Sequence, residues 1–283
     1  MQLSGYIAWR YFFSKDSSNA VNIITGISLL DILIGSAALI IVLSAFNGLE
    51  SLVKGFYADF DPELKIEVER GKFFALEDIA EEWLTDPNIE AYSYTLEEKA
   101  LLNFRDREYI STLKGVDSRY LQTNKLQNKI LYGEYRLAEN LAVTPSVMGA
   151  GVAYFLGFSR GDFQEPVTVF LPREGGNRLD PESNFRSSKI FPLGIFSIQP
   201  DFDEKYALVP LEYLQKLLNR PGEVSALELK FKAGSRLKKE QKKWQVRLGD
   251  DFRVLTRDEQ QASFLKVMKT EGLFTFLVFA LIL

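Results

Sequence analysis

Between Ile23 and Phe46 the chain has 24 consecutive residues of which only one, Asp31, is charged. As an α-helix rising ~1.5 Å per residue, this run would span ~35 Å, enough to cross the hydrocarbon layer of a bilayer with some tilt. A cleaved signal peptide is the main alternative, but its apolar region is normally ~7–15 residues long and ends in small residues. Here Leu43 stands where a small residue is expected. The run therefore predicts an uncleaved transmembrane helix over residues 21–47.

The distribution of charge divides the rest of the chain. Residues 1–20 combine a few charges with several aromatic side chains, which is typical of a segment at the lipid headgroup level. Residues 48–271 hold most of the charges, as a water-soluble domain would. Residues 272–283 carry no charge and are too few to cross a bilayer as a helix. We expect them to be the start of a second transmembrane helix, so the sequence is expected to be a piece of a longer protein.

Basic residues near the first apolar run predict its orientation. Arg10 and Lys15 precede the run, whereas acidic residues dominate just after it, so the positive-inside rule places the N-terminus in the cytoplasm. Lys266 and Lys269, before the second apolar segment, would then lie outside, which runs against the same rule. The domain at 48–271 is accordingly predicted to lie outside the cytoplasm.

Periodicity within the domain alternates between strand and helix, which predicts an α+β fold. A basic helix is expected over 237–248 with Leu237, Trp244 and Leu248 facing inward. Its lysines Lys238, Lys239, Lys242 and Lys243 are expected to form a solvated face or a contact with anionic headgroups or an acidic partner. The other expected helices are 76–84, 145–158 and 210–219. The expected strands are 64–69, two or three within 91–116 that break near 105–107, 167–171, 190–198, 226–231 and 252–255.

The absence of cysteine and histidine excludes several kinds of site. Zinc sites built on these residues, cysteine nucleophiles, Ser-His-Asp triads and disulfides are all ruled out. The chain has no phosphate-binding loop of the G-x-x-x-x-G-K-[ST] type, and its net charge of −4 with no basic stripe argues against a nucleic-acid partner. The sequence thus predicts a non-enzymatic chain without cofactor or metal.

Two short motifs were weighed as binding sites. Gly149-Ala150-Gly151 superficially resembles a dinucleotide fingerprint, but it lacks a third glycine and a predicted preceding strand, so close packing of a helix is the favoured interpretation. The acidic residues Asp201, Asp203 and Glu204 are too few and too closely spaced for a calcium loop, and are interpreted as a solvated turn.

Small and polar residues recur along one face of the first transmembrane helix. Ser28, Asp31, Gly35 and Ala38, preceded by Thr25, follow one another at steps of three or four residues. Such a stripe is what helix packing in membranes uses, because small residues let backbones approach and polar residues avoid lipid. We therefore predict that this face contacts another helix and not lipid.

Several segments resemble one family. The run Ile27–Leu30 followed by Gly35–Gly48 is similar to the first transmembrane helix of LolC/LolE-type lipoprotein-releasing permeases, within the MacB-like class of ABC transporters. Further pieces resemble the family in the expected order along nearly the whole chain: Ile7–Tyr11, Leu156–Phe158 with Gly161-Asp162, Gly194–Phe196, Phe202–Tyr206, Val209–Leu211, and Phe264 with Lys269–Glu271. One departure is Asp31, which stands where the family has a small residue.

This resemblance implies a multi-pass permease subunit of the bacterial inner membrane with its main domain in the periplasm. The expected partners are a separate LolD-like ATPase, a second permease copy or paralogue, a LolA-like periplasmic chaperone, lipoprotein cargo and membrane lipid. The stretch 172–189 would correspond to the loop that hooks the chaperone, with Arg173, Arg178, Phe185 and Arg186 as contact residues. Two alternatives stay open: a MacB- or FtsX-like permease with other cargo, and a membrane-anchored receptor without transport activity.

Overall fold

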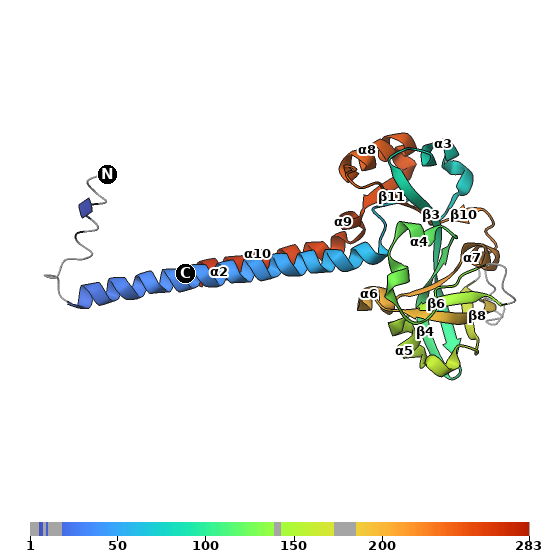
Figure 1. Ribbon diagram of the computed structural model, residues 1–283, viewed down its shortest axis with the longest axis horizontal. Coiled ribbons are helices and arrows are strands. Elements are labelled where there is room, and N and C mark those ends of the chain that lie inside the picture. Colours follow the sequence, from blue (N-terminus) through green and yellow to red (C-terminus); the bar gives the residue numbers. More distant parts are fainter. Residues whose placement is uncertain (1–5, 8–9, 11–18, 139–142, 173–184, 283) are drawn as a thin grey trace. The chain divides into compact units, whose positions relative to one another are not determined.

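The computed structural model describes residues 6–7, 10, 19–138, 143–172 and 185–282. Its contacts divide the chain into two compact units, one of residues 1–53 with 262–283 and the other of residues 54–261. Helix α2 (Asn19–Phe60) begins in the first unit and ends in the second (Figure 1).

The first unit is built on α2 and α10 (Ala262–Ile282). In the described part of the chain, one helix is long and apolar enough to cross a membrane, by length and composition, and it covers Ile23–Phe60. Its aliphatic side chains are open, with Ile40 65% and Ile41 67% exposed, an arrangement that suits lipid and not water. The apolar helix expected from the sequence is thus confirmed.

The second unit is organised around a mixed sheet of ten strands in the described residues. The order is β12-β1-β11-β3-β4-β9-β6-β8-β5, and β7 pairs with both β3 and β8. The pairs β4/β9 and β6/β8 are parallel and the others are antiparallel, so the α+β class is confirmed. The strands are β1 (Leu64–Val68), β3 (Ile89–Phe104), β4 (Arg107–Val116), β5 (Ile130–Gly133), β6 (Pro145–Gly149), β7 (Val167–Pro172), β8 (Phe185–Phe196), β9 (Tyr206–Pro210), β11 (Ala226–Phe231) and β12 (Phe252–Thr256).

Short helices flank this sheet, and a small second sheet packs against it through Phe74 and Val224, which belong to the same core. The small sheet pairs β2 (Phe74–Ala75) with β10 (Glu223–Val224). The α-helices of the unit are α3 (Glu81–Leu84), α4 (Tyr120–Thr123), α5 (Ala150–Leu156), α6 (Pro200–Asp203), α7 (Leu211–Leu218), α8 (Leu237–Leu248) and α9 (Arg257–Gln260).

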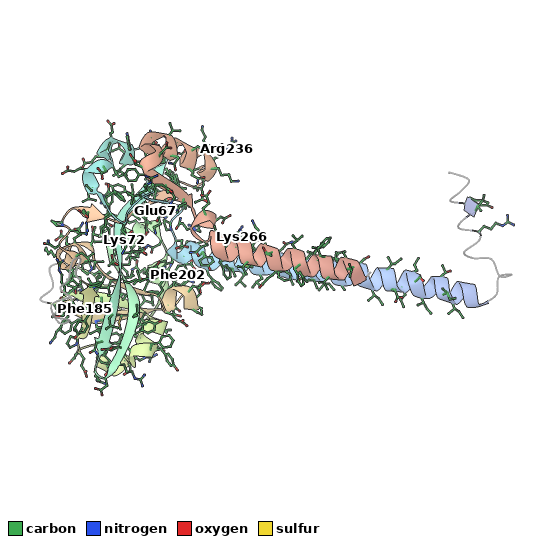
Figure 2. All side chains as sticks on the ribbon, turned by 180° about the vertical axis from the view of Figure 1, so that it is seen from behind. Glu67, Lys72, Phe185, Phe202, Arg236 and Lys266 are labelled. Carbon is green, nitrogen blue, oxygen red and sulfur yellow. The ribbon has the colours of Figure 1, made fainter. Side chains whose placement is uncertain are left out.

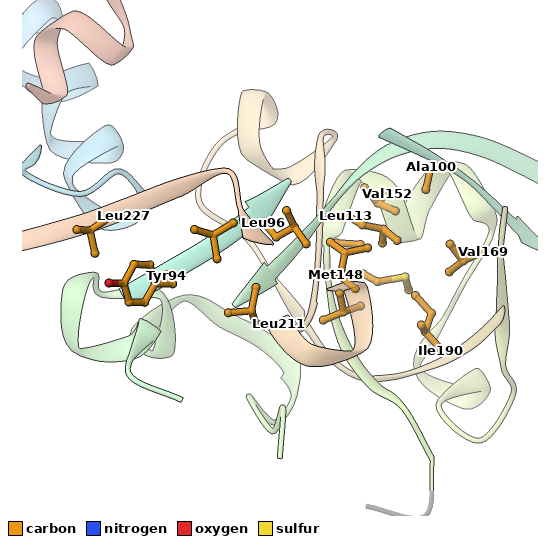
Figure 3. Close-up of a cluster of buried hydrophobic side chains, with 14 of the residues drawn as sticks. Tyr94, Leu96, Ala100, Leu113, Met148, Val152, Val169, Ile190, Leu211 and Leu227 are labelled. Carbon is orange, nitrogen blue, oxygen red and sulfur yellow. The ribbon is translucent and has the colours of Figure 1, made fainter. Parts of the chain in front are cut away.

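A continuous apolar core lies on one face of the central strands. Leu96, Leu113 and Leu227 are fully buried, and Figure 3 shows them in one cluster with Met148. Burial of each such side chain stabilises the fold by roughly 1.5–3 kcal/mol. Because alternate residues of a strand point to opposite faces, the intervening side chains gather on the other face, described below.

Two predicted helices are wrong in part. Residues 145–158 form the strand β6 before the helix α5, because the buried run Pro-Ser-Val-Met-Gly pairs with β8 and β9 and shows no polar alternation that would mark a strand. Residues 76–84 form a 3₁₀ turn, Leu76–Asp78, and the short α3 instead of one helix. By contrast, the break predicted near residues 105–107 is confirmed as a tight turn, with Arg105 at a φ of 53°.

The glycine pair beside α5 packs against α6. A Cβ at Gly149 would lie 2.2 Å from the carbonyl oxygen of Asp203, and one at Gly151 would lie 2.8 Å from the Cα of Glu204. Only glycine allows such an approach of two backbones. Packing is therefore the role of this motif, and a strand, β6, does precede it, contrary to the prediction.

Candidate functional site

The predicted packing face of α2 is divided in the structure. Gly35 and Ala38 are partly buried, whereas Ser28 and Asp31 are exposed. Both views show α10 alongside α2, and a Cβ at Gly272 of α10 would lie 3.7 Å from the Phe46 ring (Figures 1 and 2). The partly buried positions of this part of α2 are Gly35, Ala38, Leu39, Val42, Leu43, Phe46, Glu50 and Val53.

Ser28 satisfies its hydroxyl within α2. Its Oγ donates to the carbonyl oxygen of Ile24 at 3.0 Å, a bond that leaves the helix backbone intact. Asp31 lies one turn further along and is exposed within this single chain. The pair thus forms an open polar continuation of the stripe that begins at Gly35.

The predicted chaperone-contact loop is the connection of the β7/β8 hairpin. The strands pair as far as Pro172 and Phe185, so β8 begins five residues earlier than the sequence pattern predicted and the connection is shortened to 173–184. Arg173 and Arg178 fall outside the described residues. The pairing brings the two ends of the connection next to each other.

The two remaining contact residues have different surroundings. Phe185 is 47% exposed at the first position of β8 (Figure 2), which suits an apolar anchor. The neighbouring Arg186 is partly buried, and its Nη1 donates to the carbonyl oxygen of Leu217 in α7 at 2.8 Å. Arg186 therefore has a structural contact that limits how far its guanidinium can reach.

A cleft of 430 Å³ opens beside the base of this hairpin. Ion pairs join Lys72 to Glu98 at 3.1 Å and Arg220 to Glu223 at 2.7 Å, and the Arg220 guanidinium lies over the Phe73 ring at 4.8 Å. The residues that line the cleft are Lys72, Phe73, Glu98, Leu171, Pro172, Arg186, Leu218, Asn219, Arg220 and Glu223. The mixed charges fit a polar protein surface and not an acyl chain.

A buried ion-pair cluster, formed by Lys114, Glu97 and Glu228, lies on the polar face of the sheet and was missed by the sequence analysis. Lys114 in β4 is 3% exposed, and its Nζ lies 2.6 Å from Glu228 in β11 and 3.2 Å from Glu97 in β3. Glu97 and Lys114 are direct cross-strand partners, so the register itself sets this contact.

Aromatic rings enclose the buried ion-pair cluster. The Lys114 ammonium lies 5.0 Å from the centre of the Phe60 ring, 5.3 Å from that of Tyr120 and 5.8 Å from that of Tyr206. Phe60 is the last residue of α2 and packs on Phe202 with ring centres 4.5 Å apart. The end of the apolar helix is thus seated against a buried cation, an arrangement that cation–π attraction stabilises.

Electrostatics keep the cluster charged. Burial opposes ionisation of Lys114, but the carboxylates of Glu228 and Glu97 outweigh it and hold the lysine pKa well above its usual value. Burial likewise would raise the pKa of Glu97, but Lys114, followed by Lys65 and Lys205, overcomes it and lowers that pKa to about 2. Beside them, burial raises the pKa of Asp61 to about 6, although Gln261 Nε2 donates to its Oδ2 at 2.7 Å.

The acidic residues near α6 serve the fold. Asp203 accepts hydrogen bonds from the Ser197 hydroxyl and the Ile198 amide, both at 2.8 Å, and Asp201 accepts one from the Tyr57 hydroxyl at 3.0 Å. Within the described ranges no group of three or more acidic residues is arranged to hold a metal ion.

Comparison with known proteins places these features in context. No family model matches the chain. The chain is 23% identical over 232 residues to the lipoprotein-releasing system transmembrane protein LolE of Haemophilus influenzae, covering 80% of this chain and 54% of that protein. The chain thus spans about half the length of this curated relative.

Solved structures of low similarity include two transporter domains. One is the extracellular domain of the noncanonical ABC-type transporter YknZ from Gram-positive bacteria, with a TM-score of 0.48 and 12% identity over 68% of this chain and 99% of that one. The other is the periplasmic region of MacB from Actinobacillus actinomycetemcomitans, with a TM-score of 0.47 and 11% identity over 71% and 91% of the two chains. The sequence match confirms the predicted resemblance: over four-fifths of its length this chain is similar to a lipoprotein-releasing permease of the LolC/LolE type.

Proposed function

We propose that this chain is the N-terminal part of a permease subunit in an ATP-driven inner-membrane complex that extracts lipoproteins and passes them to a periplasmic chaperone. The observation that carries the proposal is the match to LolE, which covers 80% of the chain. The α+β unit would lie in the periplasm and the membrane part would cross more than once.

The physics of lipoprotein release supports a division of labour. An acyl anchor stabilises its membrane-bound state by ~0.8 kcal/mol for each buried methylene, so extraction needs an energy source and an apolar acceptor. The chain has no phosphate-binding loop of the G-x-x-x-x-G-K-[ST] type. A LolD-like ATPase would therefore supply the energy, and a LolA-like chaperone would accept the lipid.

Reconstitution of the full-length protein tests this function. We expect an ABC-type ATPase to co-purify, and proteoliposomes of the complex to release a labelled triacylated lipoprotein when ATP and the chaperone are present. Co-purification of the ATPase without lipoprotein release would instead indicate a MacB- or FtsX-like permease with other cargo. If neither is observed, the chain acts as a membrane-anchored receptor and the proposal is wrong.

Within this function, the connection 173–184 would contact the chaperone, with Arg173 and Arg178 contributing charge and Phe185 an apolar anchor. The hairpin geometry supports this, because Phe185 is exposed beside the connection. Removing 174–184 should weaken chaperone binding in a pull-down and leave the unit folded, and adding Arg173→Ala and Phe185→Ala should abolish the binding. A matched control replaces the same residues by a Gly/Ser linker of equal length, which separates loss of contact residues from a change in chain length. Unchanged affinity in both variants would exclude the loop.

The open stripe on α2 would contact a helix of a second permease copy or paralogue. Ser28 and Asp31 are exposed in the single chain, and a short carboxylate facing lipid is costly. Replacing Asp31 by Leu should weaken assembly, measured as the fraction of permease that co-purifies with the partner. Replacing Ile32 by Leu on the neighbouring face is the control. Normal assembly of the Asp31→Leu variant would remove the stripe from the proposal.

A further inference from the structure

The exposed side of α8 carries an unusual concentration of cations for a chain with a net charge of −4. We define the α8 basic face as the exposed residues Lys238, Lys239 and Lys242 of α8, together with the exposed Lys232 and Arg236 of the segment that leads into it (Figure 2 labels Arg236). Among the described residues, none of these five side chains forms an ion pair. The charge is therefore available to a ligand.

The opposite side of α8 fixes the direction in which the basic face points. Trp244 is fully buried and packs edge-on against Trp83, with ring centres 6.3 Å apart. Lys243, which the sequence grouped with the other lysines, turns inward and pairs with Asp86, and Arg247 lies 3.7 Å from the same carboxylate. The cations on the inner side of α8 are thus paired with Asp86, whereas those of the α8 basic face point away from the core.

Chain connectivity links α8 to the apolar helix α2 and to α10. Its Gln241 donates to the carbonyl oxygen of Val254 in β12 at 2.8 Å, and β12 pairs with β1 at the edge of the sheet. The strand β1 follows directly on α2, and β12 leads through α9 into α10. Thirteen residues, 249–261, separate α8 from α10, a reach of at most ~45 Å even when fully extended.

An exposed aliphatic residue completes the pattern. Val246 is 84% exposed and follows Lys242 by one helical turn, so it lies on the same side of α8 as the basic face. Cations beside an apolar side chain are typical of helices that lie against a lipid surface.

From these observations we infer that the α8 basic face binds the anionic phospholipid headgroups of the bilayer that α2 spans. Each Lys or Arg near an anionic leaflet adds roughly fivefold to the binding equilibrium, so loss of three should weaken it on the order of 100-fold. The contact would hold the α+β unit against the membrane independently of any cargo, and goes beyond the proposed transport function.

The test uses the full chain in lipid nanodiscs. Because the chain has no cysteine, a Val246→Cys substitution gives one site for a spin label. Relaxation of the label by a fixed amount of nickel-chelating lipid is compared in phosphatidylcholine discs and in discs with ~30% phosphatidylglycerol, a composition that gives the surface a strong negative potential. We expect strong relaxation in the anionic discs, suppressed when salt screens the charges.

Charge-matched variants make the result specific. Replacing Lys238, Lys239 and Lys242 by Gln should abolish the extra relaxation. Replacing Lys125, Arg136 and Lys189, which are equally exposed on other parts of the unit, should not. Equal relaxation in both kinds of disc, or equal effects of the two triple variants, would overturn the inference; the first result would leave an acidic protein as the partner to seek.

Discussion

The two faces of the central strands solve the problem of burial in opposite ways. Leu113 is fully buried on the apolar face of β4, and the next residue, Lys114, is 3% exposed on the polar face. The apolar face gains free energy from area removed from water. The polar face gains little from area and depends on the pairing of charges beneath the rings of Phe60, Tyr120 and Tyr206. Leu113 and Lys114 are thus buried to a similar extent, but substitutions at the two positions should destabilise the fold for different reasons.

The largest effect is expected for Lys114→Met, which leaves the fully buried Glu228 without its ion-pair partner. The free energy of unfolding should fall by ~3–5 kcal/mol. Urea unfolding of the chain in detergent, followed by the fluorescence of Trp83 and Trp244, measures the loss. Adding Glu228→Gln to this variant should restore much of the stability; a double variant as unstable as the single one would mean that packing and not charge dominates this face.

On the apolar face, Leu113→Ala should cost ~3 kcal/mol, through lost burial and the cavity that remains. The same unfolding experiment applies, and adding Glu228→Gln should bring no recovery here, because the leucine has no electrostatic partner. If the second substitution rescued Leu113→Ala as well, the two faces would not be independent.

Asp61, beside the buried ion-pair cluster, should make stability depend on pH. Its pKa is about 6 in the folded state against an ordinary 3.8, so protonation stabilises the fold. This contribution is fully present below about pH 4 and is lost as pH rises through about 6, a change on the order of 2–3 kcal/mol. Asp61→Asn should remove it, so the difference in unfolding free energy between the two proteins should vary over pH 4–6. A constant difference across that range would contradict the assignment.

The smallest effect is expected for an exposed ion pair between β11 and β3. Lys230 and Glu90 lie 2.6 Å apart with side chains 33% and 45% exposed. An exposed pair of this kind contributes less than ~1 kcal/mol. Lys230→Gln should therefore lower the free energy of unfolding by only a few tenths of ~1 kcal/mol. A loss as large as that of Lys114→Met would show that burial is not what distinguishes the two ion pairs.

Local patterns were sufficient for much of the fold. Helix α8 was predicted at its observed bounds because charged and apolar residues alternate with helical period over 237–248. The strands β1 and β11 were predicted from their alternation, and β12 was predicted close to its observed bounds. The pattern fails at β6, where all five residues are buried and no alternation exists to separate strand from helix.

The buried ion-pair cluster was beyond local patterns. In the run Ala226–Phe231 the alternation correctly puts Glu228 and Leu227 on opposite faces, and such a glutamate is normally solvated. Its burial depends on Phe60, Tyr120 and Tyr206, which come from three distant segments. The available signal was that Lys114 and Glu228 are each a charge beside apolar residues in a predicted strand. Of the candidate site, the sequence indicated the loop and the apolar helix. It did not indicate where β7 ends and β8 begins, and so did not give the limits of the loop.

The register of the β7/β8 hairpin has a consequence for how this protein can vary. Because Pro172 and Phe185 are strand partners, the ends of the intervening segment are held at strand spacing by bonds that lie outside it. Closing a longer segment between fixed ends costs only ~0.6 kcal/mol for each doubling of its length. A foreign peptide can therefore replace 173–184 and be presented at the surface of the unit. The pairing of β7 with β8 would stay the same, so the sheet would keep its structure.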